Sequence, residues 1–458
     1  MEDTKKKTKL GVSGYRGVWG KNLDEQITYK YALAFAKIIK QKGGTKILVG
    51  RDARPTGSLM LKAVRYAIEK EGLRCEYAGI IPSPSMLLLV KKLSYDGGVI
   101  ITASHNPKEY NGLKFVMGSG LFPVLGEVEE IEKIKNTLEK EEYKESAGIE
   151  SESFNNAEFR KIHIGEILKN IDVELIKSKK FKVALDPINS AGSIITKELL
   201  EKLGCETFII NGKQDGEFTH MPEPRVENLG EISQAVLQSK SDIGFAEDPD
   251  ADRLAVVTEK GQALSEEYTL ALAIKSVLGA PAARGGAVVA NLSTSNTNED
   301  VALSLGGTFH RTKVSDMDVI EKMQEVGAVI GGEGQGGVVY PKINMAEDSL
   351  AGIGLILELL ARENKKISEI ADSLPKYIFI KEKTSFMGNV ESIYEIIKQK
   401  FPDAKVNELD GLRLDWADRS WIHVRPSNTE PIIRIYGEAK SKDRIESLVA
   451  DVISIIKS

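Results

Sequence analysis

Apolar residues recur along the chain in short runs rich in β-branched side chains, each followed by a segment with helical spacing. Three such runs occupy residues 46–50, 182–186 and 287–291. A run of this kind predicts a buried strand that leads through a loop into a helix. Strands that alternate with helices predict an α/β fold, and the spacing of the three runs favours three comparable units over one large sheet.

The pattern changes towards the end of the chain. Residues 377–381 alternate like a strand, residues 392–400 have helical spacing, and residues 421–424 and 432–436 again read as strands. These elements predict a small α+β domain. Further upstream, a polar and acidic stretch at residues 139–156 predicts an exposed connection, and it is followed by a helical pattern from about residue 158 to residue 177.

Size and composition favour several domains and a reducing compartment. The chain has 458 residues, 41% of them hydrophobic, enough for three or four cores. Its two cysteines, Cys75 and Cys205, have no CxxC spacing, so neither a disulfide framework nor a zinc site is expected, and we expect both thiols to be buried and inert.

Neither a membrane nor a nucleic acid is an expected partner. The lysines near the N-terminus precede no apolar segment, and the longest apolar stretches, residues 85–90 and 351–361, fall short of the roughly 18 residues of a membrane span. We therefore expect a cytoplasmic protein. The net charge of −5 argues against nucleic-acid binding, although a small anionic substrate fits if a few basic side chains converge.

The first candidate motif is Thr-Ala-Ser-His-Asn-Pro at residues 102–107, directly after an apolar strand. Ser104 and His105 would then lie at the end of a buried strand, where loops commonly carry functional groups. The same residue types also favour a plain turn. A Ser/His hydrolase is another alternative, but the Gly-x-Ser-x-Gly elbow is missing and two adjacent residues are not expected to pair as nucleophile and base.

The second motif places Asp248, Asp250 and Asp252 at alternating positions after the apolar run 243–246. Three carboxylates so close together repel each other, and a hard cation bound between them would remove that cost. Magnesium is the natural candidate because it prefers oxygen ligands. A solvated acidic turn is the alternative; an EF-hand is disfavoured because the loop lacks the glycine and glutamate that such loops require.

Two further loops can bind a sugar phosphate. Residues 331–337 form a glycine-rich stretch after a predicted strand at 328–330, and Glu333 within it can accept hydrogen bonds from sugar hydroxyls. Residues 425–431, Arg-Pro-Ser-Asn-Thr-Glu-Pro, combine a guanidinium, hydroxyls and an amide that suit a phosphate. A flexible turn is the alternative for each loop.

Together and in this order, the four segments resemble the α-D-phosphohexomutase superfamily, from Gly14 to beyond Pro431. The resemblance implies three related α/β units with mixed sheets plus a smaller C-terminal α+β domain, around a central cleft. The implied domains are residues 1–155 with the phosphoserine loop, 156–258 with the metal-binding loop, 259–372 with the sugar-binding loop and 373–458 with the phosphate-binding loop.

The resemblance also implies an activity: a phosphosugar mutase that interconverts hexose or hexosamine 1-phosphates and 6-phosphates through a phosphoserine and a bound 1,6-bisphosphate. Ser104 matches the phosphoserine and, with the three aspartates, would hold Mg²⁺. Further active-site matches are Arg16, His105, Lys114 and Arg253, and the substrate-binding matches are Glu333, Arg425, Ser427, Asn428 and Thr429. Gln335 and Arg434, in or near the same loops, are further candidates for substrate binding. A sugar 1,6-bisphosphate would serve as activator, and a monomer or homodimer is expected.

The chain departs from the family pattern at several positions. Pro249 stands where many relatives have glycine, Gln335 and Gly337 where many have serine and histidine, and Ala346-Glu347 where many have Gly-Arg. These changes leave open whether the sugar is glucose, mannose or glucosamine.

Within the resemblance, Lys114 or His105 is the candidate acid and base, and Lys114 would need a lowered pKa to accept a proton. Two other functions remain open: a metal-dependent phosphatase or phosphotransferase with an aspartate nucleophile, and a non-catalytic sugar-phosphate-binding protein.

Overall fold

The computed structural model describes residues 10–12, 14–144, 156–386, 388–427 and 432–457. The chain forms two compact units, one of residues 1–269 with 336–369 and the other of residues 270–335 with 370–458. Each unit is described by itself.

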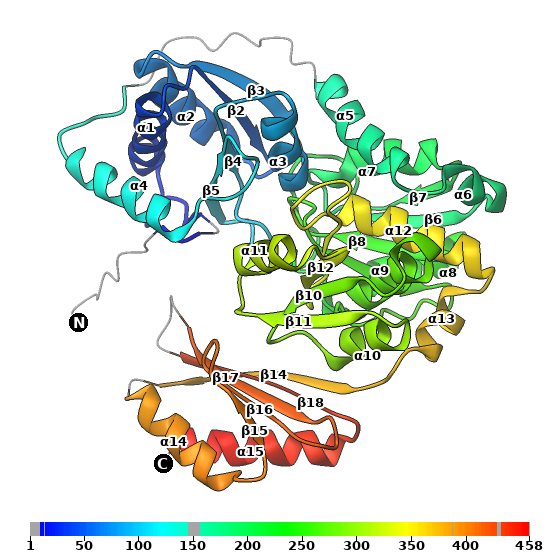
Figure 1. Ribbon diagram of the computed structural model, residues 1–458. Coiled ribbons are helices and arrows are strands. Elements are labelled where there is room, and N and C mark those ends of the chain that lie inside the picture. Colours follow the sequence, from blue (N-terminus) through cyan, green and yellow to red (C-terminus); the bar gives the residue numbers. More distant parts are fainter. Residues whose placement is uncertain (1–9, 13, 145–155, 387, 428–431, 458) are drawn as a thin grey trace. The chain divides into compact units, whose positions relative to one another are not determined.

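The first unit begins with a five-stranded mixed sheet (Figure 1). Its strands are β1 (Tyr15–Val18), β2 (Lys46–Arg51), β3 (Arg74–Ile80), β4 (Gly97–Ile101) and β5 (Tyr110–Met117), in the order β1-β5-β4-β2-β3. β2 runs parallel to β3 and β4, whereas β5 is antiparallel to β1 and β4. The accompanying helices are α1 (Glu25–Gln41), α2 (Gly57–Lys70), α3 (Ser83–Lys92) and α4 (Leu125–Thr137).

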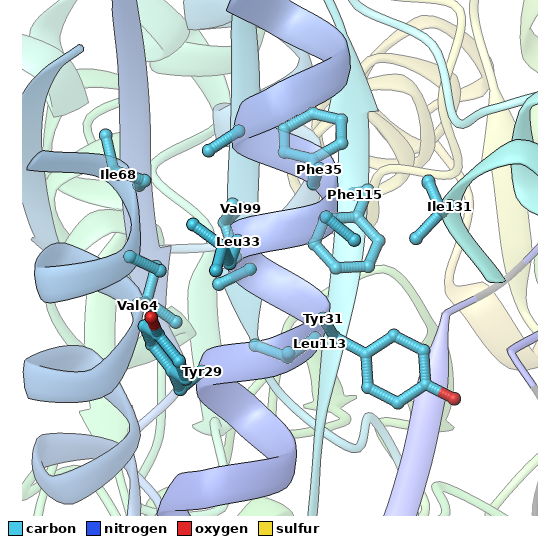
Figure 2. Close-up of a cluster of buried hydrophobic side chains, with 14 of the residues drawn as sticks. Tyr29, Tyr31, Leu33, Phe35, Val64, Ile68, Val99, Leu113, Phe115 and Ile131 are labelled. Atoms are coloured by element: carbon cyan, nitrogen blue, oxygen red, sulfur yellow. The ribbon is translucent and has the colours of Figure 1, made fainter. Parts of the chain in front are cut away.

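The core of this part lies between the sheet and helices α1, α2 and α4 (Figure 2). Phe35 of α1 stacks on Phe115 of β5 with ring centroids 4.7 Å apart. Helix α1 begins where the side chain of Asp24 accepts a hydrogen bond from the Ile27 N–H at 2.7 Å, a typical N-cap. The buried apolar side chains of α1 therefore meet the strands that the β-branched runs predict.

A second mixed sheet follows in the same unit. Its strands are β6 (Lys182–Asp186), β7 (Glu206–Ile209), β8 (Ile243–Glu247) and β9 (Leu254–Thr258), in the order β7-β6-β8-β9, and only β9 is antiparallel to its neighbour. The other elements of this part are α5 (Asn156–Lys169), α6 (Val173–Lys179), α7 (Gly192–Lys202), η1 (Val226–Asn228), α8 (Gly230–Ser239), β13 (Gly337–Val339) and α12 (Ser349–Glu363).

One predicted helix is wrong in its extent. The continuous helical pattern from 158 to 177 corresponds to two helices, α5 and α6, with a break between Lys169 and Val173. The break occurs because Asp172 starts a new helix: its side chain accepts a hydrogen bond from the Leu175 N–H at 3.0 Å. Most of the connection predicted at 139–156 lies outside the described residues.

The second unit contains a parallel arrangement in which β10 (Ala287–Asn291) lies between β11 (Thr308–Thr312) and β12 (Ile330–Glu333). Its helices are α10 (Asn296–Ser304), α11 (Asp316–Val326) and the short η2 (Pro281–Ala283); α9 (Glu267–Gly279) and α13 (Ile367–Ser373) continue across the boundaries of the two units. The glycine-rich loop predicted at 331–337 is shorter than expected. Residues 331–333 belong to β12, because Gly331 and Gly332 pair with Val289 and Ala290 of β10, and Gly337 begins β13.

The C-terminal part of the second unit is an antiparallel sheet in the order β14-β18-β17-β16-β15. The strands are β14 (Ile378–Ser385), β15 (Lys405–Asn407), β16 (Leu412–Asp415), β17 (Trp421–Pro426) and β18 (Ile432–Ala439), and the helices are α14 (Val390–Lys400) and α15 (Lys442–Lys457). Ile422, Val424, Ile433 and Ile435 pack with side chains of both helices in one core. All four elements predicted here from the pattern are present.

The predicted fold class, three α/β parts with mixed sheets and a smaller C-terminal part with an antiparallel sheet, is confirmed. Cys75 and Cys205 are both free, but they are partly rather than fully buried. In the part of the chain that the structure describes, no helix combines the length and apolar character needed to cross a membrane.

Candidate active site

Ser104 lies in the loop after β4, as the sequence predicts, but its side chain is buried, with only 2% of the residue exposed. Its φ is +49°, in the left-handed region that residues other than glycine seldom adopt. The Ser104 N–H donates to Thr102 Oγ1 at 2.9 Å. Backbone strain of this kind persists only where the surrounding structure holds it in place, and it concentrates at functional sites.

Arg54, which the sequence analysis missed, holds this loop. Its fully buried guanidinium donates at 2.5–2.9 Å to four carbonyl oxygens, those of Ser104, Asn106, Pro107 and Tyr110. Asp52 accepts from Arg54 Nε at 3.0 Å and from Thr102 Oγ1 at 2.6 Å. The sequence offered one signal for this role: Asp52 and Arg54 directly follow the buried strand β2, and charged groups at the end of a buried strand need hydrogen-bond partners.

The three aspartates predicted to bind a metal converge. Carboxylate oxygens of Asp248, Asp250 and Asp252 lie within 4.8 Å of one another, and the Ser104 hydroxyl donates to Asp248 Oδ2 at 2.8 Å. Asp250 Oδ1 and Asp252 Oδ1 are buried and accept no hydrogen bond from any described residue. Buried carboxylate oxygens without a donor suit a hard divalent cation, so these residues fit a metal ion.

Three helix N-termini hold the backbone of the metal-binding loop. Three consecutive carbonyl oxygens of this loop accept hydrogen bonds of 2.6–3.3 Å. The Pro249 carbonyl accepts from Ser190 and Ala191, which precede α7. The Asp250 carbonyl accepts from Ser83 in α3, and the Ala251 carbonyl accepts from Ser349 in α12. The positive ends of three helix dipoles therefore lie close to three carboxylates, which favours their ionised form. Proline at position 249, where many relatives have glycine, is compatible with this arrangement, because the residue contributes its carbonyl oxygen as an acceptor and needs no N–H donor.

Lys114 is the buried counter-charge of the aspartates. Its Nζ donates to Asp250 Oδ2 at 2.7 Å and to Asp252 Oδ2 at 2.9 Å. Burial alone would lower the pKa of Lys114, but the two carboxylates more than offset it and the pKa is raised. In the metal-free protein the two carboxylates therefore favour the protonated form of Lys114, a shift opposite to the lowered pKa that a general base at this position requires.

The aspartates themselves differ in charge preference. Burial opposes ionisation of Asp250, but Lys114 more than offsets this effect and the pKa is lowered. Burial, followed by the negative charges of Asp252 and Asp250, raises the pKa of Asp248 well above its usual range. Without a cation, burial and the neighbouring negative charges thus oppose ionisation of both Asp248 and Asp252.

Of three further predicted residues, His105 contacts Ser104, and Arg16 and Arg253 lie close enough to His105 to influence its charge. His105 Nδ1 lies 3.2 Å from Ser104 Oγ, and burial, followed by the positive charges of Arg253 and Arg16, lowers the pKa of His105 well below its usual value. A neutral imidazole can accept a proton. Arg16 Nη1 donates to Asn106 Oδ1 at 3.1 Å, and Arg253 Nη1 lies 3.3 Å from Glu223 Oε1.

The predicted sugar-binding residues lie in the second unit. Glu333 ends β12 with 3% of its surface exposed and accepts a hydrogen bond from Gln335 Nε2. The N–H of Gly334 between them donates to Thr294 Oγ1 at 3.2 Å. This short turn brings a carboxylate and an amide together at the end of a strand.

The predicted phosphate-binding loop carries a row of basic side chains. Arg425 of β17 lies opposite Arg434 of β18, which in turn lies opposite Lys383 of β14. Like charges at opposed positions repel each other, and Arg425 Nη1 has Asp410 Oδ2 at 3.5 Å. The Ser427 N–H donates to the Ile432 carbonyl at 2.9 Å. The candidates Asn428 and Thr429 lie outside the described residues.

Comparison with protein families covers nearly the whole chain. Residues 7–144, 161–261 and 265–377 match the phosphoglucomutase/phosphomannomutase alpha/beta/alpha domains I, II and III, and residues 381–455 match the C-terminal domain of the same family. The chain belongs to the phosphoglucomutase/phosphomannomutase family. This family lies within the α-D-phosphohexomutase superfamily, so the resemblance stated from the four motifs is confirmed.

Individual members of the family are similar over their full length. A phosphoglucomutase/phosphomannomutase of Thermococcus kodakarensis is 34% identical over 443 residues, with 95% of each chain covered. A phosphoglucosamine/phosphogalactosamine mutase of Sulfurisphaera tokodaii is also 34% identical, over 455 residues that cover 98% of this chain and 99% of the relative. The solved structure of a family protein from Burkholderia thailandensis has a TM-score of 0.83 at 25% identity and 98% coverage of both chains.

Proposed function

We propose that this family member is a phosphosugar mutase that interconverts the 1-phosphate and 6-phosphate of a hexose or hexosamine through phosphorylated Ser104 and a bound 1,6-bisphosphate. One observation carries the proposal: the Ser104 hydroxyl, buried and in a strained conformation, lies 2.8 Å from the carboxylate of Asp248 in a cluster of three aspartates. The activities named for the two relatives support the same class of reaction.

Charge neutralisation and positioning are the main requirements of phosphoryl transfer. Mg²⁺ bound by Asp248, Asp250 and Asp252 with an oxygen of phospho-Ser104 would supply part of that neutralisation. Arg253 and Arg16 add positive charge beside the serine, and Arg54 fixes the loop that presents it. His105, whose Nδ1 lies 3.2 Å from Ser104 Oγ, and Lys114 are the candidate base and acid for the sugar hydroxyl. The pKa of His105 would have to rise, and that of Lys114 to fall, towards neutral pH when metal and substrate bind.

The second unit would bind the part of the substrate that is not reacting. Glu333 and Gln335 offer hydrogen-bonding groups for sugar hydroxyls. Arg425, Arg434 and Ser427, together with Asn428 and Thr429, would take the distal phosphate, whose charge relieves the repulsion within the basic row. The proposal includes a four-domain division after residues 155, 258 and 372, a bisphosphate activator, and a monomer or homodimer in the cytoplasm.

A substrate panel tests the function directly. Glucose, mannose and glucosamine 1- and 6-phosphates are assayed with Mg²⁺ and a catalytic amount of the matching bisphosphate, and the phosphorylated residue is located by peptide mass spectrometry. We expect conversion of at least one pair and phosphate on Ser104. Phosphate on Asp248 with release of inorganic phosphate would instead indicate an aspartate phosphatase. Binding without turnover across the panel would indicate a non-catalytic protein.

A further inference from the structure

A buried chain of hydrogen bonds joins Ser85, His163 and Asp348, three residues that have no role in the reaction proposed above. Ser85 Oγ lies 2.7 Å from His163 Nδ1, and His163 Nε2 lies 2.7 Å from Asp348 Oδ2. The order of groups is that of a hydrolytic triad. The three residues are only 0%, 0% and 1% exposed, however, so no substrate reaches them. Any role of these hydrogen bonds must therefore come from the two helices that they connect.

One end of this series of hydrogen bonds, Ser85, lies at the start of helix α3. Ser85 lies in the first turn of α3, two residues after Ser83. The Ser83 hydroxyl donates to Asp250 Oδ2 at 2.5 Å, and the Ser83 N–H donates to the Asp250 carbonyl at 2.9 Å. The start of α3 therefore holds both the backbone and the side chain of one proposed metal ligand.

The other end of this series of hydrogen bonds, Asp348, lies at the start of helix α12. Asp348 caps this helix, because its Oδ1 accepts from the N–H groups of Leu350 and Ala351 at 3.0 and 3.2 Å. The next residue, Ser349, donates through its N–H to the Ala251 carbonyl at 3.3 Å, and its hydroxyl lies 2.8 Å from the same carbonyl and 2.7 Å from Glu247 Oε1. The start of α12 thus contacts the loop at Ala251, one residue after Asp250, which the start of α3 contacts.

We propose that His163 is a positioning residue for the metal-binding loop, tying the starts of α3 and α12 together so that the aspartates keep the spacing a divalent cation requires. A carboxylate can only accept hydrogen bonds, so His163 donates from Nε2 to Asp348, and its Nδ1 is hydrogen-bonded to the Ser85 hydroxyl. The inference rests on the proposed function in one respect: it assumes that the three aspartates bind a metal.

The test measures Mn²⁺ binding to the metal-free full-length protein by electron paramagnetic resonance, without any sugar. His163→Phe keeps an aromatic ring and removes both hydrogen bonds. We expect it to weaken Mn²⁺ binding by about ten-fold, the lower limit for losing an outer-shell support of a metal site. At saturating Mg²⁺, kcat should fall while KM for the sugar phosphate stays within about two-fold, because the substrate-binding loops are unchanged.

Ile167→Ala is the matched control. Ile167 lies one turn further along the same helix α5, is fully buried, and faces Gly354 of α12. Its truncation loosens the packing between α5 and α12 but leaves the hydrogen-bond chain intact. It should therefore lower the thermal midpoint and leave Mn²⁺ affinity within about two-fold of wild type, since its loss affects packing alone. His163→Gln, which can still donate to Asp348, should recover part of the affinity.

Each outcome decides the question. Mn²⁺ affinity in His163→Phe equal to that in Ile167→Ala would overturn the positioning role while leaving the mutase proposal in place. Absence of Mn²⁺ binding in wild type would overturn the metal site itself and this inference with it. If His163→Phe does not fold, Ser85→Ala decides: a weakened affinity supports the connection, and an unchanged one overturns it.

Discussion

Replacing Lys114 with methionine would remove the positive charge that the structure buries among the aspartates. Lys114 Nζ contacts Asp250 and Asp252 at 2.7 and 2.9 Å, and the side chains of Lys114 and Asp250 are 5% and 0% exposed. Methionine keeps most of the unbranched stem and donates no hydrogen bond. In the absence of metal, three carboxylates would then face one another without their nearest cation.

Breaking a buried ion pair by removing one partner typically costs about 3–5 kcal/mol, because the remaining charge stays desolvated. Proton uptake by one of the carboxylates offsets part of this penalty. We therefore expect Lys114→Met to lose about 3 kcal/mol of unfolding free energy at pH 7 in EDTA. A divalent cation replaces the missing charge, so the loss should shrink in excess Mg²⁺ through preferential binding to the folded state.

Urea unfolding followed by circular dichroism, in EDTA and in Mg²⁺, measures both quantities. Lys108→Met is the control, because the ion pair of Lys108 with Glu217 is exposed, the two side chains being 59% and 63% exposed; its loss should stay below about 1 kcal/mol. A Lys114→Met loss that is equally large with and without Mg²⁺, or no larger than that of the control, would refute the view of Lys114 as a stand-in for the metal.

Three other predictions test separate parts of the site. Ser104→Ala should abolish turnover and protein phosphorylation, seen in intact mass spectra, while circular dichroism remains that of the wild type; substantial turnover would exclude Ser104 as the phosphoryl carrier. Arg425→Ala should raise KM for the monophosphate about ten- to hundred-fold, the equivalent of roughly 1.5–3 kcal/mol for a charged hydrogen bond, with Ser104 still phosphorylated; an unchanged KM would place Arg425 outside the substrate site. Burial raises the pKa of Glu247 from 4.5 to about 7, so the stability that neutral Glu247 contributes is fully present below pH 4.5 and is lost as the pH rises to about 7. Glu247→Gln should remove this loss, on the order of 3 kcal/mol, and parallel urea stability profiles of the two proteins at pH 5 and 8 in EDTA would contradict the assignment.

The sequence predicted the elements that local patterns encode. The β-branched runs at 46–50, 182–186 and 287–291 became β2, β6 and β10, because such side chains pack well in a buried sheet. The triplet Asp248, Asp250 and Asp252 was also readable, since adjacent carboxylates carry an electrostatic cost that implies a ligand.

The contacts that hold these site residues in place could not be predicted from the sequence. Arg54 reaches four carbonyls in a loop about fifty residues further along the chain, and periodicity does not say which loop a buried guanidinium will meet. The serines that hold the metal-binding loop likewise look like ordinary helix starts. The pKa of Lys114 was not readable for the same reason, because it depends on Asp250 and Asp252, over a hundred positions away.

The charges around Ser104 would couple the two events that the proposed reaction requires, metal binding and serine phosphorylation. In the metal-free protein, Lys114 and Arg253 offset two of the three aspartates, and the raised pKa of Asp248 favours a proton on the third. Phosphorylation of Ser104 would add about two negative charges beside that carboxylate, which the present cations cannot balance. A divalent cation would displace the proton from Asp248 and balance the phosphate at once. Metal binding and serine phosphorylation are therefore expected to strengthen each other, with the helix N-termini keeping the loop ready for both.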